Sequence, residues 1–439
     1  MGISQQPPKR FPIKKGIPCQ LKWTHSTVYL TEGISASCHR AGYGKIEMDG
    51  DKFNFHNIAN KLEDRTKMLN GQWPGNGCEH CKHIEEAGGT SDRMVHLEME
   101  GTTSPPELET DLEAVQVTPR QLEVYWGNTC NLKCIYCAAH YSSKIHQEEK
   151  RFGPFNIEGV TMDANRWKMF DRIEEATEKL FIWFENNIQH LHKLFIMGGE
   201  PFLQKETERM IALLETKELP DLTLCFFSNL TVDHDRVKNW VHRLENLVKQ
   251  KRLDKLQIVG SLDSWGPEAE YVRNGLDLKL FQKNFEYILN ESSTLQNINS
   301  ALTITAVSGM PELVKHINQW SKIRPVYWSM MKASTYIKFK SYNEPGRPYL
   351  YPGIFGRKVN DIGLKEAVDL FDVNSHGYPD SVKVHYKNYM NGLINEFEKR
   401  EPDLFRQKQL KIYLTELDRR RGTDYKKTFP TIAEWLDKV

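Results

Sequence analysis

Cysteine spacing constrains this chain more than any other feature of its sequence. Seven of the eight cysteines fall into two groups, one between residues 19 and 81 and the other between residues 130 and 137. In an intracellular chain of 439 residues, such clustering favours metal binding or catalysis over a disulfide framework. The eighth, Cys225, lies in an apolar run and fits there as a small buried hydrophobic residue.

The second group forms a C-x3-C-x2-C motif. Its members, Cys130, Cys134 and Cys137, follow residues 121–127, whose alternating pattern predicts a buried strand. A closed zinc site needs four ligands, and His140 is the residue that would complete one here. Three close thiolates without a fourth instead suit an iron–sulfur cube with one iron open to another ligand. The motif therefore predicts an iron–sulfur cluster, with zinc as the alternative.

Composition and charge exclude several classes of protein. Hydrophobic residues make up 39% and charged residues 27% of the chain, which excludes wholesale disorder and fibrous repeats. The net charge of +1 gives no reason to expect nucleic-acid binding. No apolar run approaches the roughly 18 residues of a membrane span, the amino terminus has no apolar secretory segment, and Gln6 does not fit an N-myristoylation signal. We therefore expect a soluble, cytoplasmic protein.

Strand and helix patterns alternate through the middle of the chain. They predict further strands at residues 192–198, 222–227, 256–262, 301–307 and 326–328, and helices at residues 232–251, 278–290 and 311–323. Such alternation predicts parallel β/α units and an α/β fold class. In β/α barrels the active site lies at the carboxyl ends of the strands, and the motifs of this chain follow predicted strands.

With the aromatic Tyr136 before its last cysteine, the C-x3-C-x2-C motif resembles the signature of the radical S-adenosylmethionine (radical SAM) superfamily. The resemblance implies a partial (β/α)6 TIM-like barrel in which Cys130, Cys134 and Cys137 hold a 4Fe–4S cluster. It also implies that the open iron binds S-adenosylmethionine (SAM). Reductive cleavage of SAM would then give a 5′-deoxyadenosyl radical that abstracts a hydrogen atom from a substrate. The implied electron source is a one-electron donor such as flavodoxin or ferredoxin.

A second motif, Gly198-Gly199-Glu200-Pro201, follows a predicted strand and resembles the GGEP motif of the same superfamily. Two glycines allow the backbone to approach a ligand closely, and a carboxylate accepts hydrogen bonds from an ammonium group. The resemblance assigns Gly198, Gly199 and Glu200 to the methionine end of SAM. Without the cysteine motif upstream, this sequence would equally predict a simple turn.

Further SAM contacts are implied after the next strands. Ser261 and Asp263 resemble a Ser-x-Asp stretch that contacts the SAM ribose, and Arg273 resembles an arginine that binds the SAM carboxylate. A helix cap at Ser264 or Asp263 and a surface salt bridge at Arg273 are the simpler alternatives.

The adenine of SAM is implied to pack against Tyr136 and against a stretch that contains Val307 and Gly309. Asn229 matches a position that often reads Thr-Asn-Gly in relatives. Here Leu230 stands in place of that glycine, which is a departure from the pattern.

The first cysteine group reads C-x13-G-x4-C from Cys19 through Gly33 to Cys38, and then C-x2-C at Cys78 and Cys81. This spacing resembles the auxiliary-cluster motif of SPASM and twitch modules. It therefore implies a second 4Fe–4S cluster on these cysteines, with a zinc ribbon as the alternative. In most relatives the module follows the radical SAM core, whereas in this chain it precedes the core.

We expect four segments: a SPASM/twitch-like module at 1–97, an acidic linker at 98–113, the radical SAM core at 114–335 and a mainly helical extension at 336–439. Within the module, the sequence predicts a hairpin between residues 27–30 and 44–48 and a helix at 55–70.

The carboxyl-terminal tail carries a basic run and two aromatic residues. The run at 419–421 predicts a solvated helix end, with contact to an acidic partner as the alternative. Tyr413 and Trp435 are expected to dock the tail onto the barrel.

The resemblance also bears on the substrate. Relatives with twitch or SPASM modules most often modify peptide or protein side chains, by oxidation, cross-linking or epimerisation. We therefore expect such a reaction, assisted by the second cluster. The alternatives are the same chemistry on a small sugar or nucleotide-type metabolite, and a non-enzymatic iron–sulfur or zinc protein with a redox or binding role.

Overall fold

The computed structural model describes residues 19–50, 52–75, 77–86, 88, 91–94, 115–160, 168–332, 347–371 and 380–439. The predicted linker at 98–113 and the start of the chain lie outside these residues. The chain forms two compact units. Unit 1 comprises Met1–Trp126, Met169–Ile196 and Glu218–Thr223, and unit 2 comprises Gly127–Lys168, Met197–Lys217 and Leu224–Val439.

The sheet of unit 1 has the strand order β7-β6-β4-β1-β2-β3. The strands are β1 (His25–Tyr29), β2 (Ile34–Ala36), β3 (Gly44–Lys45), β4 (Gln121–Tyr125), β6 (Lys193–Met197) and the first half of β7 (Leu219–Ser228). The helices are α1 (Gln20–Thr24), α2 (Ala59–Leu69), α3 (Glu79–Glu86), α7 (Ile173–Asn187) and the short η1 (Ile188–His190). β1 pairs in parallel with β4, which sets Thr27 opposite Glu123. The cysteine-rich segment thus adds a parallel strand beside the first strand of the predicted β/α series.

The predicted hairpin between residues 27–30 and 44–48 is wrong in its pairing. β2 lies between β1 and β3 and pairs antiparallel with both. β2 is only three residues long, so its sequence carries too little alternation to reveal a strand. The helix predicted at 55–70 corresponds to α2.

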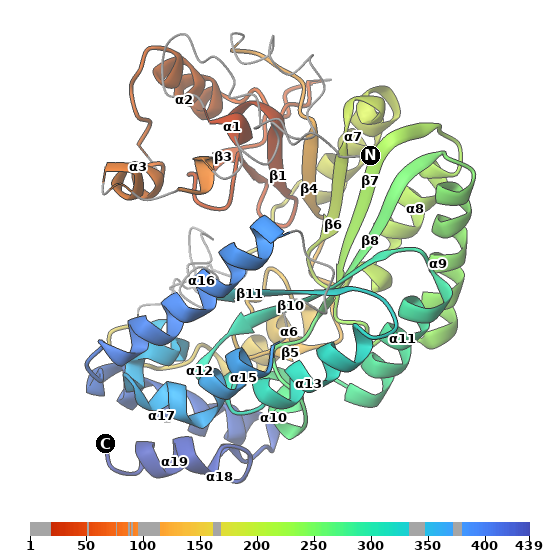
Figure 1. Ribbon diagram of the computed structural model, residues 1–439. Helices are drawn as coiled ribbons and strands as arrows, with labels where there is room; N and C mark the ends of the chain where they lie inside the picture. Colours follow the sequence, from red (N-terminus) through yellow and green to blue (C-terminus); the bar gives the residue numbers. More distant parts are fainter. Residues whose placement is uncertain are drawn as a thin grey trace. The chain divides into compact units, whose positions relative to one another are not determined.

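Unit 2 contains a parallel sheet in the order β7-β8-β10-β11. It uses the second half of β7, β8 (Leu253–Ser261), β10 (Leu295–Leu302) and β11 (Val326–Lys332). The connecting helices are α8 (Lys205–Leu214), α9 (His234–Lys249), α10 (Pro267–Val272), α11 (Leu278–Glu291), α12 (Ile304–Val307) and α13 (Met310–Trp320). Pairing of β8 with β10 and of β10 with β11 is parallel, as strand–helix alternation predicts. Helices α8 and α9 lie along the same side of β7 and β8 (Figure 1).

Close packing fixes these helices on the sheet. Gly260 in β8 has no side chain, and a Cβ placed there would lie 3.2–3.3 Å from atoms of Phe281, Phe285 and Ile298. α11 can therefore approach β8 closely, because a larger residue would force these rings apart. The helix begins at a capping residue, Asp277, whose side chain accepts a hydrogen bond from the Leu280 amide.

The strand predicted at 301–307 is wrong in its bounds. β10 ends at Leu302, and the following residues form the short helix α12. Every residue of α12 is buried, so the run is apolar on all sides. Such a run cannot be assigned to a strand or a helix by periodicity. The predicted strand at 326–328 is longer, since β11 continues to Lys332.

The cysteine loop and the tail complete unit 2. The remaining elements of unit 2 are β5 (Lys133–Cys134), α6 (Ser143–Phe152), η2 (Pro201–Leu203), β9 (Arg273–Asn274), η3 (Pro348–Leu350), η4 (Pro352–Phe355), η5 (Asn360–Leu364), α15 (Lys365–Leu370), α16 (Asp380–Glu398), α17 (Leu404–Arg421), α18 (Tyr425–Thr428) and α19 (Pro430–Leu436). The elements in the described residues 347–371 and 380–439 of the tail are all helices. No helix in the described part of the chain is long and apolar enough to cross a membrane.

The predicted solvated end of this tail is wrong for two of its three arginines. The Arg419 side chain is 58% exposed, whereas those of Arg420 and Arg421 are 1% and 4% exposed. Their burial follows from partners elsewhere in unit 2, which the local charge pattern does not show.

Candidate functional site

The loop between β4 and α6 carries the three closely spaced cysteines. All eight cysteines of the chain are described, and none forms a disulfide. Cys134 lies on β5, which pairs with β9 and sets this cysteine opposite Arg273. Burial raises the pKa of the Cys134 thiol, although the charges of Arg273 and Arg421 act in the opposite direction. The middle cysteine is therefore held by backbone pairing in a buried, cation-lined position.

Polar N–H groups point at two of the sulfur atoms. The Arg273 Nη1 lies 3.9 Å from Cys134 Sγ, and the Asn229 Nδ2 lies 4.0 Å from Cys130 Sγ. The backbone amide of Leu132 also donates to Cys130 Sγ at 3.5 Å. Hydrogen bonds of this kind stabilise thiolates and tune iron–sulfur clusters. The donor set fits the implied cluster in its chemistry.

As the side chains stand, no group of three or more His, Cys, Asp or Glu residues within the described ranges is arranged to hold a metal ion. His140, the alternative fourth zinc ligand, is buried, and its Nε2 lies 3.4 Å from the carbonyl oxygen of Lys168.

The loop after β6 packs directly on the cysteine loop. Gly198 and Gly199 both have positive φ, at 80° and 41°. A Cβ on Gly199 would lie 2.3 Å from the carbonyl oxygen of Thr129, the residue before Cys130. The same carbonyl accepts a hydrogen bond from the Glu200 amide at 2.8 Å. Glycine is required here because the two motifs share a contact with no room for a side chain.

Glu200 is a fully buried carboxylate at this contact. Its Oε1 accepts hydrogen bonds from Ser228 Oγ at 2.7 Å and from the Phe202 amide at 3.1 Å, and its Oε2 accepts from the Asn229 amide at 2.7 Å. Burial raises the pKa of Glu200 to about 7, and these hydrogen bonds offset only part of that effect.

Asp263 joins three other segments of the site. It is fully buried, and its carboxylate accepts from Tyr136 Oη at 2.8 Å, from Arg273 Nε and Nη2 at 2.9 and 3.0 Å, and from the Ala301 amide at 2.8 Å. The structure therefore brings Tyr136, Asp263 and Arg273 into one network. Burial alone would lower the pKa of Arg273, but the carboxylate of Asp263 keeps it well above its usual value.

The other implied SAM residues lie at the end of β8 and at the end of α12, which follows β10. Ser261 ends β8 in register with Asn299, and Val307 is fully buried at the end of α12. The Gly309 carbonyl accepts a hydrogen bond from the Trp265 amide at 3.1 Å, which places this stretch beside the segment after Asp263.

Asn229 bonds to Asn131 as well as to the segments already described, through Nδ2 to Oδ1 at 2.9 Å. Leu230, which stands where relatives have glycine, adopts a φ of 49°. Leu230 therefore adopts the left-handed backbone conformation that glycine favours, and it does so with backbone strain that glycine would not have.

Sequence reasoning missed two residues at this site. Gln204 donates from Nε2 to the Gly198 carbonyl at 2.9 Å, and Arg347 donates from Nη1 to the Ile135 carbonyl at 2.6 Å. Gln204 is only six residues from Gly198, so its contact with this loop could have been predicted from the local sequence. Arg347 is 212 residues from Ile135, so nothing in the sequence relates them.

The amino-terminal cysteines belong to unit 1. Cys19, Cys78 and Cys38 pack in one apolar cluster with Trp23 and Met68. Burial and the charge of Cys38 raise the pKa of Cys19 to about 12, and burial raises that of Cys78 to about 11. The pKa of Cys81 is raised as well, by burial first, with contributions from Asp92 and Cys38. Cys38 thus lies close enough to contribute to the raised pKa values of Cys19, Cys78 and Cys81.

Comparison with known families agrees with the middle of the chain. Residues 124–299 match the family described as the Radical SAM superfamily, so this part of the chain is similar to radical SAM domains. No curated protein matches the sequence significantly.

Among solved structures, the chain is similar to SuiB of Streptococcus suis. For the structures bound to S-adenosylmethionine and to the precursor peptide SuiA, sequence identity is 16% and the TM-score is 0.34; the matches cover 76% of this chain and 66% of SuiB. A third SuiB structure has 16% identity and a TM-score of 0.31, covering 69% of this chain and 60% of SuiB.

Replacement of Gly199 by alanine tests the contact between the two motifs. We expect Gly199→Ala to destabilise the metal-free protein by about 1–3 kcal/mol more than Gly422→Ala, because only at Gly199 does the new Cβ meet backbone. Gly422 has a φ of 67° and open space around it, so it controls for backbone strain alone. Urea unfolding followed by circular dichroism measures both, and equal losses would contradict the contact.

The pH dependence of stability tests the burial of Glu200. Its pKa rises from 4.5 to about 7 on folding, so the folded chain retains a proton that the unfolded chain loses in this range. The contribution of Glu200 to the free energy of unfolding is therefore largest below about pH 4.5. About 3 kcal/mol of this contribution is lost as the pH rises to about 7. We expect the stability of the wild type relative to Glu200→Gln to fall across this range. A pH-independent difference would show that Glu200 is not held in a desolvated site.

Proposed function

We propose that Cys130, Cys134 and Cys137 hold a 4Fe–4S cluster with SAM on its open iron, and that the enzyme acts on a peptide or protein side chain. The observation that carries this proposal is the shared contact of the cysteine motif and the Gly198–Glu200 motif at the Thr129 carbonyl, within the radical SAM domain. When bound and reduced, this pair supplies a 5′-deoxyadenosyl radical that removes a hydrogen atom from the substrate. A partial (β/α)6 barrel around the site is part of the proposal.

Glu200 is suited to receive the SAM ammonium group. A carboxylate offers about four acceptor sites, and donors from the described residues occupy three of those on Glu200, which leaves one for an ammonium N–H. An arriving cation would favour the ionised form of this buried acid and lower its pKa. The absence of a side chain at Gly199 lets the Thr129 carbonyl lie directly against the Glu200 loop.

Arg273 and Asp263 have a positioning role in this proposal. Four protein donors fill the acceptor sites of the Asp263 carboxylate, so it fixes Tyr136 and Arg273. Arg273 keeps Nη1 directed at Cys134, where its charge stabilises a thiolate. The contacts of Tyr136, Asn229, Ser261, Asp263, Arg273 and Val307 with SAM stay predictions.

A second 4Fe–4S cluster on Cys19, Cys38, Cys78 and Cys81 is also proposed. The spacing of these cysteines and the packing of three of them in one cluster of unit 1 support it. The same spacing supports the peptide substrate, since it resembles modules of peptide-modifying relatives. A one-electron donor such as flavodoxin or ferredoxin and a cytoplasmic location belong to the same proposal.

Cysteine variants test both metal sites. After anaerobic reconstitution we expect about eight irons per wild-type chain and about four in Cys134→Ala and in Cys78→Ala. Cys134→Ala should form no 5′-deoxyadenosine with SAM and dithionite, whereas Cys78→Ala should retain SAM cleavage but not substrate conversion. Cys225→Ala is the matched control because Cys225 is a buried cysteine outside both groups. About four irons and one zinc in the wild type would contradict the second cluster.

Isotope transfer tests the substrate class. The reconstituted enzyme is incubated with SAM and with two fractions from cells grown in deuterated medium, one of peptides and proteins and one of small metabolites. We expect deuterium in 5′-deoxyadenosine only with the first fraction, measured by mass spectrometry. Transfer from the metabolite fraction alone would contradict a peptide substrate.

A further inference from the structure

The main chain around Cys134 is bonded to side chains from the far end of the sequence. Arg421, the last residue of α17, donates from Nη1 to the Lys133 carbonyl at 2.9 Å. The Ile135 carbonyl accepts from Tyr413 Oη and, at 2.6 Å, from Arg347 Nη1. The carbonyls on both sides of Cys134 are thus held from the tail. We call Arg347, Tyr413 and Arg421 the C-terminal clamp.

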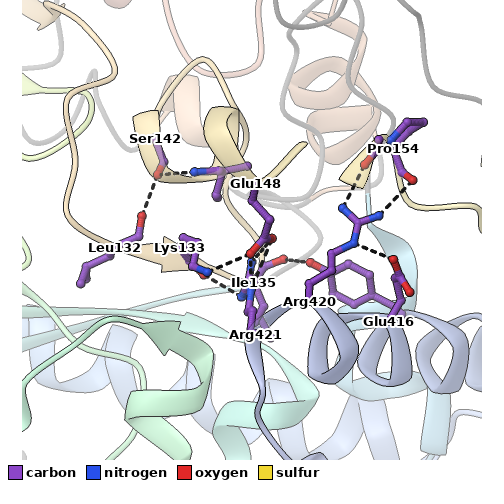
Figure 2. Close-up of polar contacts among 12 residues, drawn as sticks. Leu132, Lys133, Ile135, Ser142, Glu148, Pro154, Glu416, Arg420 and Arg421 are labelled. Atoms are coloured by element: carbon purple, nitrogen blue, oxygen red, sulfur yellow. Dashed lines mark hydrogen bonds and ion pairs between the residues drawn. The ribbon is translucent and has the colours of Figure 1, made fainter. Parts of the chain in front are cut away.

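A buried charge cluster fixes the clamp in place. Arg421 donates to Glu148 of α6 from Nη2 at 2.9 Å and from Nε at 3.0 Å, and Lys133 Nζ lies 2.9 Å from the same carboxylate (Figure 2). The side chains of Arg421 and Glu148 are each only 4% exposed. Burial would raise the pKa of Glu148, but its bonds to Arg421 and Lys133 outweigh this and hold the pKa below its usual value. Arg421 and Lys133 thus share one buried carboxylate beside the cysteine loop.

The rest of α17 is anchored to the same region. Tyr413 is buried, with its ring centroid 4.8 Å from that of Phe155. Arg420 donates to the carbonyls of Gly153 and Pro154 at 2.9 and 3.1 Å, as Figure 2 shows for Pro154. Arg420 also pairs with Glu416 on its own helix. The helix therefore has little freedom to move away from the cysteine loop.

The opposite side of the loop is tied to α6. Ser142 caps this helix by accepting from the Ile145 amide at 3.2 Å, and its hydroxyl donates to the Leu132 carbonyl at 2.6 Å (Figure 2). Consecutive carbonyls at 132 and 133 and the one at 135 thus have side-chain donors. Such side-chain support is what keeps metal ligands within a narrow range of positions.

We propose that the carboxyl end of α17 is a positioning element for the cluster site. Arg421, with Tyr413 and Arg347, fixes the main chain on both sides of Cys134 and places a buried positive charge beside that ligand. The tail then contributes to retention of the cluster and to its reduction potential, because the reduced cluster carries one more negative charge. The effect on potential rests on the proposed function, whereas the hold on the loop does not.

Hydrogen exchange of the metal-free protein tests the hold on the loop. We expect backbone amides in residues 130–137 to exchange about tenfold faster in Arg421→Gln than in the wild type, since a buried hydrogen-bonded pair is broken. Arg419→Gln is the matched control, because Arg419 lies on the same helical turn but is exposed. Equal exchange in the two variants would overturn the proposal.

A milder variant protects this test against unfolding. Tyr413→Phe removes one donor to Ile135 while it keeps the ring, so we expect faster exchange confined to the same loop, with β8 and β10 unchanged. If Arg421→Gln does not fold, the test depends on Tyr413→Phe. Unchanged hydrogen exchange of residues 130–137 in Tyr413→Phe would then overturn the proposal that the C-terminal clamp fixes the cysteine loop.

Redox titration tests whether the positive charge of Arg421 affects the reduction potential of the cluster. In the Cys78→Ala background, which isolates one cluster, we expect Arg421→Gln to shift the midpoint potential to a more negative value. Arg421→Lys, which keeps the charge, and Arg419→Gln should match the parent. An unshifted potential in Arg421→Gln would overturn the electrostatic part of the proposal. Failure of the parent to form any cluster would contradict the proposed function, while the exchange data would still decide the hold on the loop.

Discussion

The buried carboxylate of Asp263 is the interaction on which the site of unit 2 depends. It is desolvated, and it is compensated by a bidentate arginine, a phenol and a backbone amide. These donors come from β9, the cysteine loop and β10, so one side chain locks three segments together. Loss of any donor would leave a charge in an environment that cannot solvate it, which is costly. The position of Arg273 beside Cys134 follows from this bond.

The same principle organises the other charges around the cysteine loop. Glu200 and Glu148 are buried carboxylates as well, each supplied with several donors. Arg273 and Arg421 bring positive charge to Cys134 from different parts of the sequence. The charges of these two arginines oppose the effect of burial on the Cys134 thiol, while the main chain of the loop is fixed by neighbouring segments. Rigid support and cationic surroundings are both what a cluster site requires.

Much of this arrangement could be predicted from local sequence, and the failures share one cause. The cysteine motif, the glycine–glutamate motif and most strands and helices of unit 2 were predicted, since each depends on residues close in the chain. The strand at 301–307 was wrong because a run buried on all sides has no diagnostic period. The hairpin pairing in unit 1 was wrong because β2 is too short to show alternation. Arg420 and Arg421 were misassigned because their partners lie more than 260 residues away.

The sequence by itself determined which chemistry is available: three thiols after a strand, two glycines before a glutamate, and parallel β/α units to present them. Only the tertiary structure decided which groups surround the thiols. It brought Asp263 to Arg273 and Tyr136, and it brought the end of α17 to Lys133 and Ile135. The physical reason is that ligand type and local backbone are written in short segments. Whether a charged side chain can be buried, in contrast, depends on hydrogen-bond donors from distant segments, which lie beside it only after the chain has folded.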